Sequence, residues 1–485
     1  MPPSQWQTYK QNKFTGENKI PAIEQLQPDQ LLVAYNTVAT PDYGLQSRKG
    51  KTRLNVASLG AGPIRGLWRY AKAGGSAYLV ALHGTTLYAG TWAGAAAAVT
   101  FASIKTGLSA TAPLRGVVWK DNLILTNGVD NPFRYDGSAC TDLLGTPPKS
   151  AHAKVYASRL FFVDTANPNW LRWSGLESFD TWDALDVINV RDNDGDQITG
   201  LAPMPGGMVI FKRNSAWTLY GNNKDDMQLV QLSDSVGCVA TDSIIDDGVM
   251  LSYDNLWKFN LSGLQEFPQT HKSLISILTG AQRQAVKGMS VPYEKRMVWM
   301  LPNLCLNFEG ATGGMTTWTD INAGALSCAT GAADDGSLLV GDATNGIVYA
   351  LNNENDDDGT DFFTEFWLPA TDLGSTRDKV WRIFEPEISV LTGANTDGTA
   401  TLTLKYNVDR GEKQNWYQPA TTATDPLVFS SGDDWDAKVW GPSNTSLRWP
   451  MHNARGRRCS LRLASNSRIK FEGYSIMFRE AGKLL

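Results

Sequence analysis

Short apolar runs recur along the middle of the chain at nearly regular intervals. They begin at residues 79, 123, 160, 208, 249, 297 and 338, so their starts are separated by 44, 37, 48, 41, 48 and 41 residues. After each run comes a turn rich in Asn, Asp or Gly and then a segment with an aromatic residue: Tyr88, Tyr135, Trp173, Tyr220, Phe259, Phe308 and Tyr349. A continuous apolar run is typical of a strand buried on both faces, and the segment after it of a more peripheral strand.

This periodicity predicts an all-β fold. A period of about 43 residues is the length of a four-stranded blade, and sheets that cannot bury their faces alone pack radially into a β-propeller. Seven units fit six or seven blades, because ring closure often combines strands from both ends of the array. We therefore expect a six- or seven-bladed β-propeller over residues 59–360, with a short helix at 273–285, where apolar residues have helical spacing.

The two flanks of the array have a different pattern. After about residue 361, strand-like stretches such as 401–406 and 469–476 continue without the regular period. This pattern predicts a C-terminal β-sandwich-like domain over residues 361–485. Residues 1–58 precede the first repeat and are interpreted as an N-terminal arm.

Composition and charge narrow the function classes. The 45 glycines and 10% aromatic residues suit strands joined by tight turns. A net charge of −5 argues against a protein that grips nucleic acid, although a protein that DNA merely slides past needs no basic excess. The N-terminus lacks the features of a secretory signal and the uncharged segment 91–104 is too short to span a membrane, so we expect synthesis in the cytoplasm and no membrane contact. Five scattered cysteines indicate buried free thiols.

The sequence Gly-Leu-Gln-Ser-Arg-Lys-Gly-Lys-Thr at 44–52 resembles a nucleotide-binding P-loop. A P-loop has four residues between its first glycine and its Gly-Lys-Thr, because that length wraps backbone N–H groups around a phosphate. Five residues intervene here, and glycines and a proline follow where the helix should run. We therefore expect no nucleotide site.

The acidic segment 353–359 is the strongest candidate metal site. Residues here match positions 1, 3, 5, 6 and 12 of a calcium loop. Position 1 is Glu rather than Asp, position 8 is charged, and the flanks have strand-like sequences. We interpret the segment as an interdomain turn and leave calcium binding open for the matching residues Glu354, Asp356, Asp358, Gly359 and Glu365.

Other chemistry has weaker signals. The chain has no Gly-x-Ser-x-Gly motif. Of its four histidines, His83 and His271 border strands or turns, and His152 and His452 have no acidic or cysteine neighbour at ligand spacing. The acidic loop 192–196 lacks the glycine and glutamate of a calcium loop and is interpreted as a turn. We assign no catalytic, cofactor or metal residue and expect no enzyme activity, while a glycosidase-like carboxylate pair stays open. Aromatic residues at 169–182 could stack sugars, but we interpret them as packing between blades.

Several stretches resemble the tail nozzle proteins, also called tail stabilisation or tubular proteins, of short-tailed bacteriophages. They are residues 160–162, 171–183, 195–201, 209–221, 236–240, 346–349 and 357–359, the closing stretches 456–463 and 471–478, and in the arm Pro21, Leu26, Pro28, Gln30, Asn36, Gly44, Leu45, Arg48 and Gly50. In this comparison the segment 44–52 is a turn that leads into the first blade. Its glycines would permit a hairpin, and its basic residues would face solvent or a neighbouring subunit.

The resemblance implies a structural protein of the virion tail. Such a subunit forms a homo-hexameric ring beneath the portal, seals the packaged double-stranded DNA and forms part of the ejection conduit without binding the DNA specifically. Its partners would be other copies of itself and the tail adaptor or head-to-tail connector proteins, with tail fibres, spikes or a tail needle as further candidates. The alternative is a carbohydrate-binding or carbohydrate-cleaving propeller used in host recognition.

Overall fold

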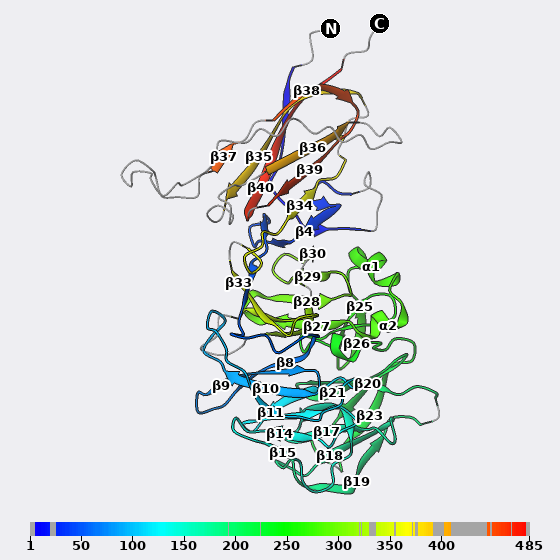
Figure 1. Ribbon diagram of the computed structural model, residues 1–485. Helices are drawn as coiled ribbons and strands as arrows, with labels where there is room; N and C mark the ends of the chain where they lie inside the picture. The colour runs from blue at the N-terminus through cyan, green and yellow to red at the C-terminus, as the bar shows by residue number, and fades with distance from the viewer. Residues whose placement is uncertain are drawn as a thin grey trace. The chain divides into compact units, whose positions relative to one another are not determined.

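The computed structural model describes residues 5–19, 26–192, 194–223, 225–319, 321, 323–328, 336–353, 356–370, 372–373, 377–390, 402–408, 444–446, 449–466 and 468–481 (Figure 1). Strands make up 52% and helices 5%, so the all-β prediction is confirmed. The chain divides into two compact units. The first contains Met1–Lys51, Leu304–Asp320 and Asn353–Leu485, and the second contains Thr52–Asn303 and Ile321–Asn352.

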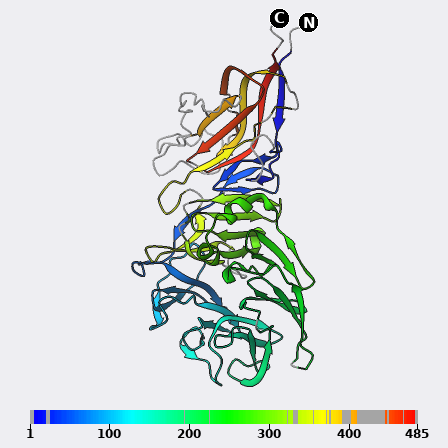
Figure 2. The same ribbon diagram turned by 90° about the vertical axis from the view of Figure 1, so that its right-hand side faces the viewer.

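The second unit begins with four antiparallel sheets of four strands each, and every sheet is built from consecutive strands. The first two sheets are β8 (Ile64–Ala71), β9 (Ala77–His83), β10 (Thr86–Thr91) and β11 (Ala102–Lys105), then β12 (Arg115–Trp119), β13 (Asn122–Thr126), β14 (Phe133–Tyr135) and β15 (Cys140–Asp142). The next two are β16 (Ser150–Tyr156), β17 (Arg159–Asp164), β18 (Trp170–Ser174) and β19 (Trp182–Asn189), then β20 (Ile198–Met204), β21 (Gly207–Lys212), β22 (Ala216–Tyr220) and β23 (Gln228–Ser233). Figure 2 shows this succession from blue to green.

Three smaller groups of strands complete the second unit. A three-stranded sheet contains β24 (Val249–Leu251), β25 (Leu256–Asn260) and β26 (Gly263–Glu266), and a hairpin contains β27 (Lys287–Val291) and β28 (Arg296–Met300). The last sheet has the order β31 (Ala323–Cys328), β32 (Leu338–Asp342), β33 (Val348–Asn353) and β7 (Gly50–Arg53). Because Leu54 N donates to Val348 O at 2.8 Å, a strand from the start of the array completes a sheet from its end.

The apolar runs of the sequence form one kind of strand. They lie in β9, β13, β17, β21, β24, β28 and β32, and the aromatic residues that follow lie in β10, β14, β18, β22, β25, β29 (Cys305–Glu309) and β33. In the four-stranded sheets the apolar strand is interior to the sheet, as the order β20-β21-β22-β23 shows. All six residues of β21 are buried. The predicted hairpins are therefore confirmed, because a strand covered on both faces selects apolar residues at every position.

The predicted helix at 273–285 is two short helices, α1 (Lys272–Ser276) and α2 (Gly280–Gln284). Thr279 begins α2 with a capping box, in which its hydroxyl accepts from Gln282 N while the Gln282 side chain accepts from Thr279 N. The cap interrupts the helical pattern and leaves Ile277 76% exposed. The described residues of this unit also form three short 3-10 helices, η1 (Thr241–Ser243), η2 (Gln269–His271) and η3 (Pro292–Glu294).

The first unit combines strands from three parts of the chain. Its N-terminal strands are β1 (Gln7–Gln11), β2 (Gly16–Glu17), β3 (Gln30–Leu31), β4 (Val33–Tyr35), β5 (Thr37–Ala39) and β6 (Leu45–Ser47), followed by β29 (Cys305–Glu309) and β30 (Gly314–Trp318). Its later strands are β34 (Thr364–Trp367), β35 (Lys379–Val390), β36 (Leu402–Val408), β37 (Asn444–Ser446), β38 (Trp449–Gly456), β39 (Cys459–Ser465) and β40 (Ile469–Glu480). Figure 1 shows the blue strand β1 beside the red strand β40, with which it pairs.

The N-terminal region is not a separate arm. β4 pairs with β30 on one side and β34 on the other, and β6 pairs with β40. Phe14, Leu31 and Leu45 are fully buried in a core shared with Trp381 and Phe471. The described residues of 5–51 therefore belong to the same folded unit as the C-terminal strands, because the N-terminal and C-terminal strands hydrogen-bond to one another and bury their apolar side chains in one core.

The bounds of the two units differ from the domain bounds expected from the sequence. The second unit begins at Thr52 rather than at residue 59, ends at Asn352 rather than at 360, and lacks Leu304–Asp320. The parallel pairing of β30 with β4 explains the last difference, since it places this hairpin in the first unit.

Candidate functional site

A cavity of about 510 Å³ lies in the second unit and is lined by residues from seven segments. The segments are β8, β12, β16, β20, residues 241–247 with η1, β27 and β31. They contact one another in a closed cycle: β8 contacts β12, β12 contacts β16, β16 contacts β20, η1 contacts β27, and β31 contacts both β27 and β8. Thr241 closes the remaining gap by donating its hydroxyl to Thr199 O in β20.

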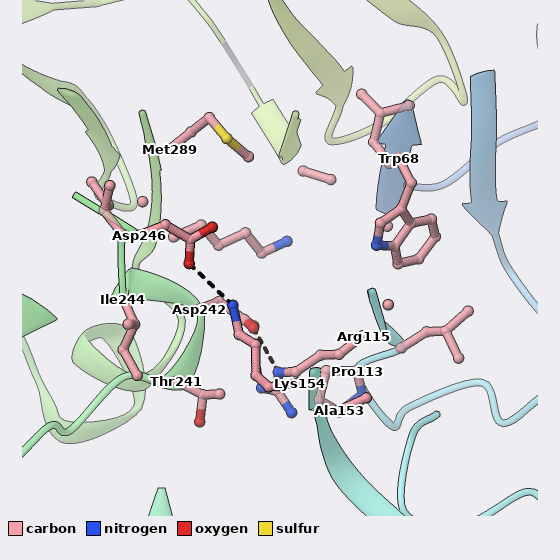
Figure 3. Close-up of a pocket in the computed structure, with 18 of the residues that line it drawn as sticks. Trp68, Pro113, Arg115, Ala153, Lys154, Thr241, Asp242, Ile244, Asp246 and Met289 are labelled. Atoms are coloured by element: carbon pink, nitrogen blue, oxygen red, sulfur yellow. Dashed lines mark hydrogen bonds and ion pairs between the residues drawn. The ribbon is translucent and has the colours of Figure 1, made fainter. Parts of the chain in front are cut away.

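Charged side chains reach into this cavity from different segments. The cations Arg65, Arg69, Arg115, Lys154 and Lys287 come from four strands, whereas the carboxylates Asp242, Asp246 and Asp247 come from the single segment 241–247. Arg115 Nε lies 2.6 Å from Asp242 Oδ1 and Arg115 Nη2 lies 3.2 Å from Oδ2. Lys154 Nζ lies 3.2 Å from Asp246 Oδ1, and Figure 3 shows both pairs. Because two sheets separate β12 from η1 in the cycle, the bidentate pair bridges the cavity.

Burial and these charges set the ionisation of the groups around the bridge. Burial favours protonated Asp242, but the attraction and hydrogen bonds of Arg115, with a contribution from Lys287, hold the pKa of Asp242 below its ordinary value. Burial also lowers the pKa of Lys287, against the attraction of Asp242 and with the repulsion of Arg115 and Arg65. Burial, with repulsion from Arg115, lowers the pKa of His152 to about 3, so its ring is neutral at pH 7.

An apolar surface lies on another wall of the cavity. The Trp68 indole, labelled in Figure 3, lies close to Gly66 of its own strand and to Gly116 of β12 in the next sheet. A Cβ at Gly66 would lie 2.2 Å from Trp68 Cη2, and a Cβ at Gly116 would lie 3.1 Å from its Nε1. Met289 and Ile244 also line the cavity. The cavity therefore combines a cationic wall with an aromatic face.

A second polar centre is buried in the first unit around Arg48. Arg48 Nη1 and Nη2 donate to the two oxygens of Asp357 at 2.9 and 2.6 Å. Arg48 Nε donates to Asn36 Oδ1 at 3.0 Å, and the remaining donors reach Lys49 O at 3.0 Å and Thr319 O at 3.4 Å. The side chains of Arg48 and Asp357 are only 1% and 7% exposed. This geometry is a bidentate ion pair removed from solvent.

The environment of Arg48 corrects the interpretation of segment 44–52. We expected its basic residues to face solvent or a neighbouring subunit. Lys49 is exposed, but Arg48 is buried, with its guanidinium 4.3 Å from the centre of the Phe362 ring. The β5–β6 hairpin does form here, and Tyr43 rather than a glycine has the positive φ of 64°. Gly50 lets its backbone approach that of Asp356 closely, since a Cβ at position 50 would lie 1.9 Å from Asp356 O.

The structure does not gather the calcium-loop residues around one point. Glu354 lies outside the described residues, Asp356 Oδ1 accepts from Gly359 N at 2.6 Å, and Asp358 is exposed. Glu365 is buried in β34, where it accepts from Trp367 Nε1 and pairs with Arg462. Within the described ranges, no group of three or more His, Cys, Asp or Glu side chains could hold a metal ion. Asp357, which the calcium pattern skips, is also buried.

The aromatic residues at 169–182 mainly pack against other side chains. Trp182 stacks on Phe162 with ring centres 5.0 Å apart, and its Nε1 donates to Phe179 O. Phe179 makes an edge contact with Trp119 of the preceding sheet at 6.1 Å. Packing between neighbouring sheets is thus observed, as expected from the sequence.

The structure describes the side chains of four cysteines. Cys238, Cys305 and Cys459 are buried free thiols, as expected, whereas Cys140 is half-buried. Burial raises the pKa of Cys238 and of Cys305 to about 12, so both are protonated at pH 7. The side chain of Cys328 lies outside the described residues.

Among the helices that the structure describes, none is long and apolar enough to cross a membrane.

No family model and no curated protein matches this chain. Solved structures resemble it at low identity. The extracellular domain of the putative one component system BT4673 from B. thetaiotaomicron has 10% identity and a TM-score of 0.44, over 82% of this chain and 57% of that chain. The Neurospora crassa Pan2 WD40 domain has 10% identity and a TM-score of 0.40, over 63% of this chain and 97% of that chain. YCF48 bound to D1 peptide has 9% identity and a TM-score of 0.38, over 63% of this chain and 95% of that chain. Likenesses at this level carry no information on function.

Proposed function

We propose that this protein is a structural subunit of a bacteriophage tail, which forms a sixfold nozzle ring with the tail adaptor or connector proteins and lines part of the DNA ejection conduit. The observation that carries the proposal is the number of times that the chain crosses from one compact unit to the other. The chain passes between them four times, after residues 51, 303, 320 and 352. Two units joined by a single linker move independently by default, whereas four connections restrict such motion. This restriction suits a wall that must hold its shape under pressure.

The Arg48 centre supports the same role. Arg48 precedes the first crossing, Thr319 precedes the third, and Asp357 follows the fourth. One buried guanidinium thus binds the ends of three of the four connecting segments. A bidentate, desolvated pair holds such ends in a defined geometry.

In the same proposal the second unit is a seven-bladed β-propeller, and the C-terminal strands form a β-sandwich-like domain completed by the N-terminal strands. The closed cycle of seven lining segments supports seven blades, each supplying its innermost segment. The pairing of β7 with β33 supports closure of the ring by the first strand of the array. The bridge between Arg115 and Asp242 occupies the central cavity, so we place the DNA path on the axis of the hexamer rather than through one propeller.

The experiment that tests the proposal is the copy number of the protein in purified virus-like particles from the source of this gene. Quantitative mass spectrometry would scale its peptides to those of the portal protein. We expect six copies for every twelve portal subunits, because a closed ring fixes the stoichiometry. Three copies, or a multiple of three above six, would instead indicate a spike or receptor-binding protein. Absence from particles would leave the carbohydrate-active propeller as the better explanation.

A second experiment addresses how the ring assembles. Deleting residues 1–50 would not test assembly separately from folding, because the deletion removes residues such as Phe14 and Leu45 from the core of the first unit. The full chain should instead be analysed by mass photometry alone and after mixing with the adaptor protein. A hexamer formed with or without the adaptor supports the proposal, and a chain that stays monomeric with a correctly assembled portal–adaptor complex contradicts it.

A further inference from the structure

We propose that the central cavity of the second unit is a binding site for a small organic dianion, such as a phosphate monoester with an apolar body. This inference does not depend on the proposed tail function, because it concerns the isolated chain. It rests on the charges, the partners and the shape of the cavity.

The first observation is an excess of positive charge. Five cationic side chains and three carboxylates line the cavity, and His152 is neutral, so the cations outnumber the carboxylates of the lining by two. The protein as a whole carries a net charge of −5. A local excess of cations in a concave site attracts anions even when the surrounding surface is acidic.

The second observation is that two of these cations have only neutral partners among the contacts that the structure gives them. Arg65 donates to the carbonyl oxygens of Gly84, Ser109 and Ala112, at 2.8, 3.0 and 2.6 Å. Lys287 Nζ donates to Gly324 O. Carbonyl groups orient these side chains but do not neutralise them. The carboxylate that attracts Lys287 is that of Asp242, and Arg115 already donates to both of its oxygens.

These cations line the same cavity, from β8, β12 and β27. The charges of Arg115 and Arg65 both disfavour the protonated form of Lys287, and Asp242 alone opposes them. Arg65, Arg115 and Lys287 therefore form a three-cation group with one carboxylate. Its two uncompensated charges match a dianion, which would relieve the mutual repulsion of the group.

The third observation is the size of the cavity and its aromatic face. A volume of about 510 Å³ is in the range of small-molecule sites and is larger than a bare phosphate needs. The Trp68 indole lies close to Gly66 and Gly116 and lines the cavity together with Met289. The Asp246 side chain is 80% exposed, so this end of the cavity opens to solvent. The geometry suits an anionic head at the cations and an apolar body on the indole.

The test uses the full chain with inorganic phosphate and phenyl phosphate as probes at pH 8, where both are dianionic, and at constant ionic strength. Isothermal titration calorimetry and thermal unfolding would measure binding. We expect phenyl phosphate to bind and to raise the melting temperature, with inorganic phosphate binding more weakly. Lys287→Gln should weaken phenyl phosphate about tenfold, because it removes one charge-assisted contact. Trp68→Leu should remove most of the advantage of phenyl phosphate over inorganic phosphate.

A matched control is available in Lys149, whose Nζ also donates to a single carbonyl, Val129 O, but at an exposed position. Lys149→Gln should leave binding unchanged. Met289→Glu provides an independent variant, because a carboxylate in the cavity should abolish binding without removing a native hydrogen bond. Equal stabilisation of the wild type and Lys287→Gln would identify a general salt effect and overturn the proposal. Failure of 10 mM phenyl phosphate to bind the wild type would also overturn it.

Discussion

Removing the guanidinium of Arg48 tests whether its ion pair with Asp357 holds the first unit together. In Arg48→Met, Asp357 would keep its hydrogen bond from Lys51 N at 3.1 Å but lose both bonds to the guanidinium. The carboxylate would then be buried at 7% exposure without a cation. Breaking such a pair from one side costs about 3–5 kcal/mol, most of it from the charge left behind.

This cost converts into a measurable shift. For a folded unit of about 150–250 residues, 1 kcal/mol corresponds to about 2–4 °C, so we expect the transition of the first unit to fall by about 6–20 °C. Differential scanning calorimetry suits the measurement, because two units can give two transitions that a single optical probe would average. Urea titration would supply the free energy of unfolding independently.

A double-mutant cycle and a surface control make the test specific. Arg48→Met combined with Asp357→Leu should cost less than the sum of the single changes, since neither charge is then left alone. Arg377→Met removes an ion pair with Glu480 in the same unit, but Arg377 is 75% exposed, so we expect a cost below about 1 kcal/mol. If Arg48→Met costs no more than Arg377→Met, the reasoning about a desolvated pair is wrong.

Three further changes test other parts of the structure. Gly50→Ala should destabilise the protein by at least about 2 kcal/mol, because its Cβ would lie 1.9 Å from a backbone oxygen, whereas Gly74→Ala, with no atom within 4 Å, should stay within about 0.5 kcal/mol in the same thermal assay. His152 has a pKa of about 3 in the folded state against 6.5 in the unfolded state, so the unfolded state binds the proton first and stability is lost as the pH falls from 6.5 towards 3. Urea titrations at pH 7 and pH 5 should therefore show about 2 kcal/mol less acid destabilisation in His152→Gln than in the wild type. Equal losses in the two proteins would contradict the low pKa of His152. Trp182→Ala should cost roughly 2 kcal/mol by removing the stack on Phe162, and a glycan array should show no change; saturable glycan binding that this variant loses would favour the carbohydrate alternative.

The repeating strands could be predicted from the sequence because their burial leaves a local pattern. Each apolar run at a spacing near 43 residues lies in a strand that is covered on both faces, and each following aromatic lies in the next strand. The buried thiols of Cys238 and Cys305 were likewise expected from their scattered positions. Such features depend on a few neighbouring residues, so one chain segment contains the information.

The contacts that define the candidate sites depend on residues far apart in the chain. Arg115 and Asp242 are 127 positions apart, and Arg48 and Asp357 are 309 apart. Segment 44–52 gave a P-loop-like pattern and acidic segment 353–359 gave a calcium-like pattern, but the structure joins the two segments through an ion pair that neither pattern contains. The N-terminal strands were interpreted as an arm because nothing in their local sequence specifies β30, β34 and β40 as partners. Periodicity shows which residues are buried, whereas the choice of partner is made by the packing of distant segments, and here only the tertiary structure decided it.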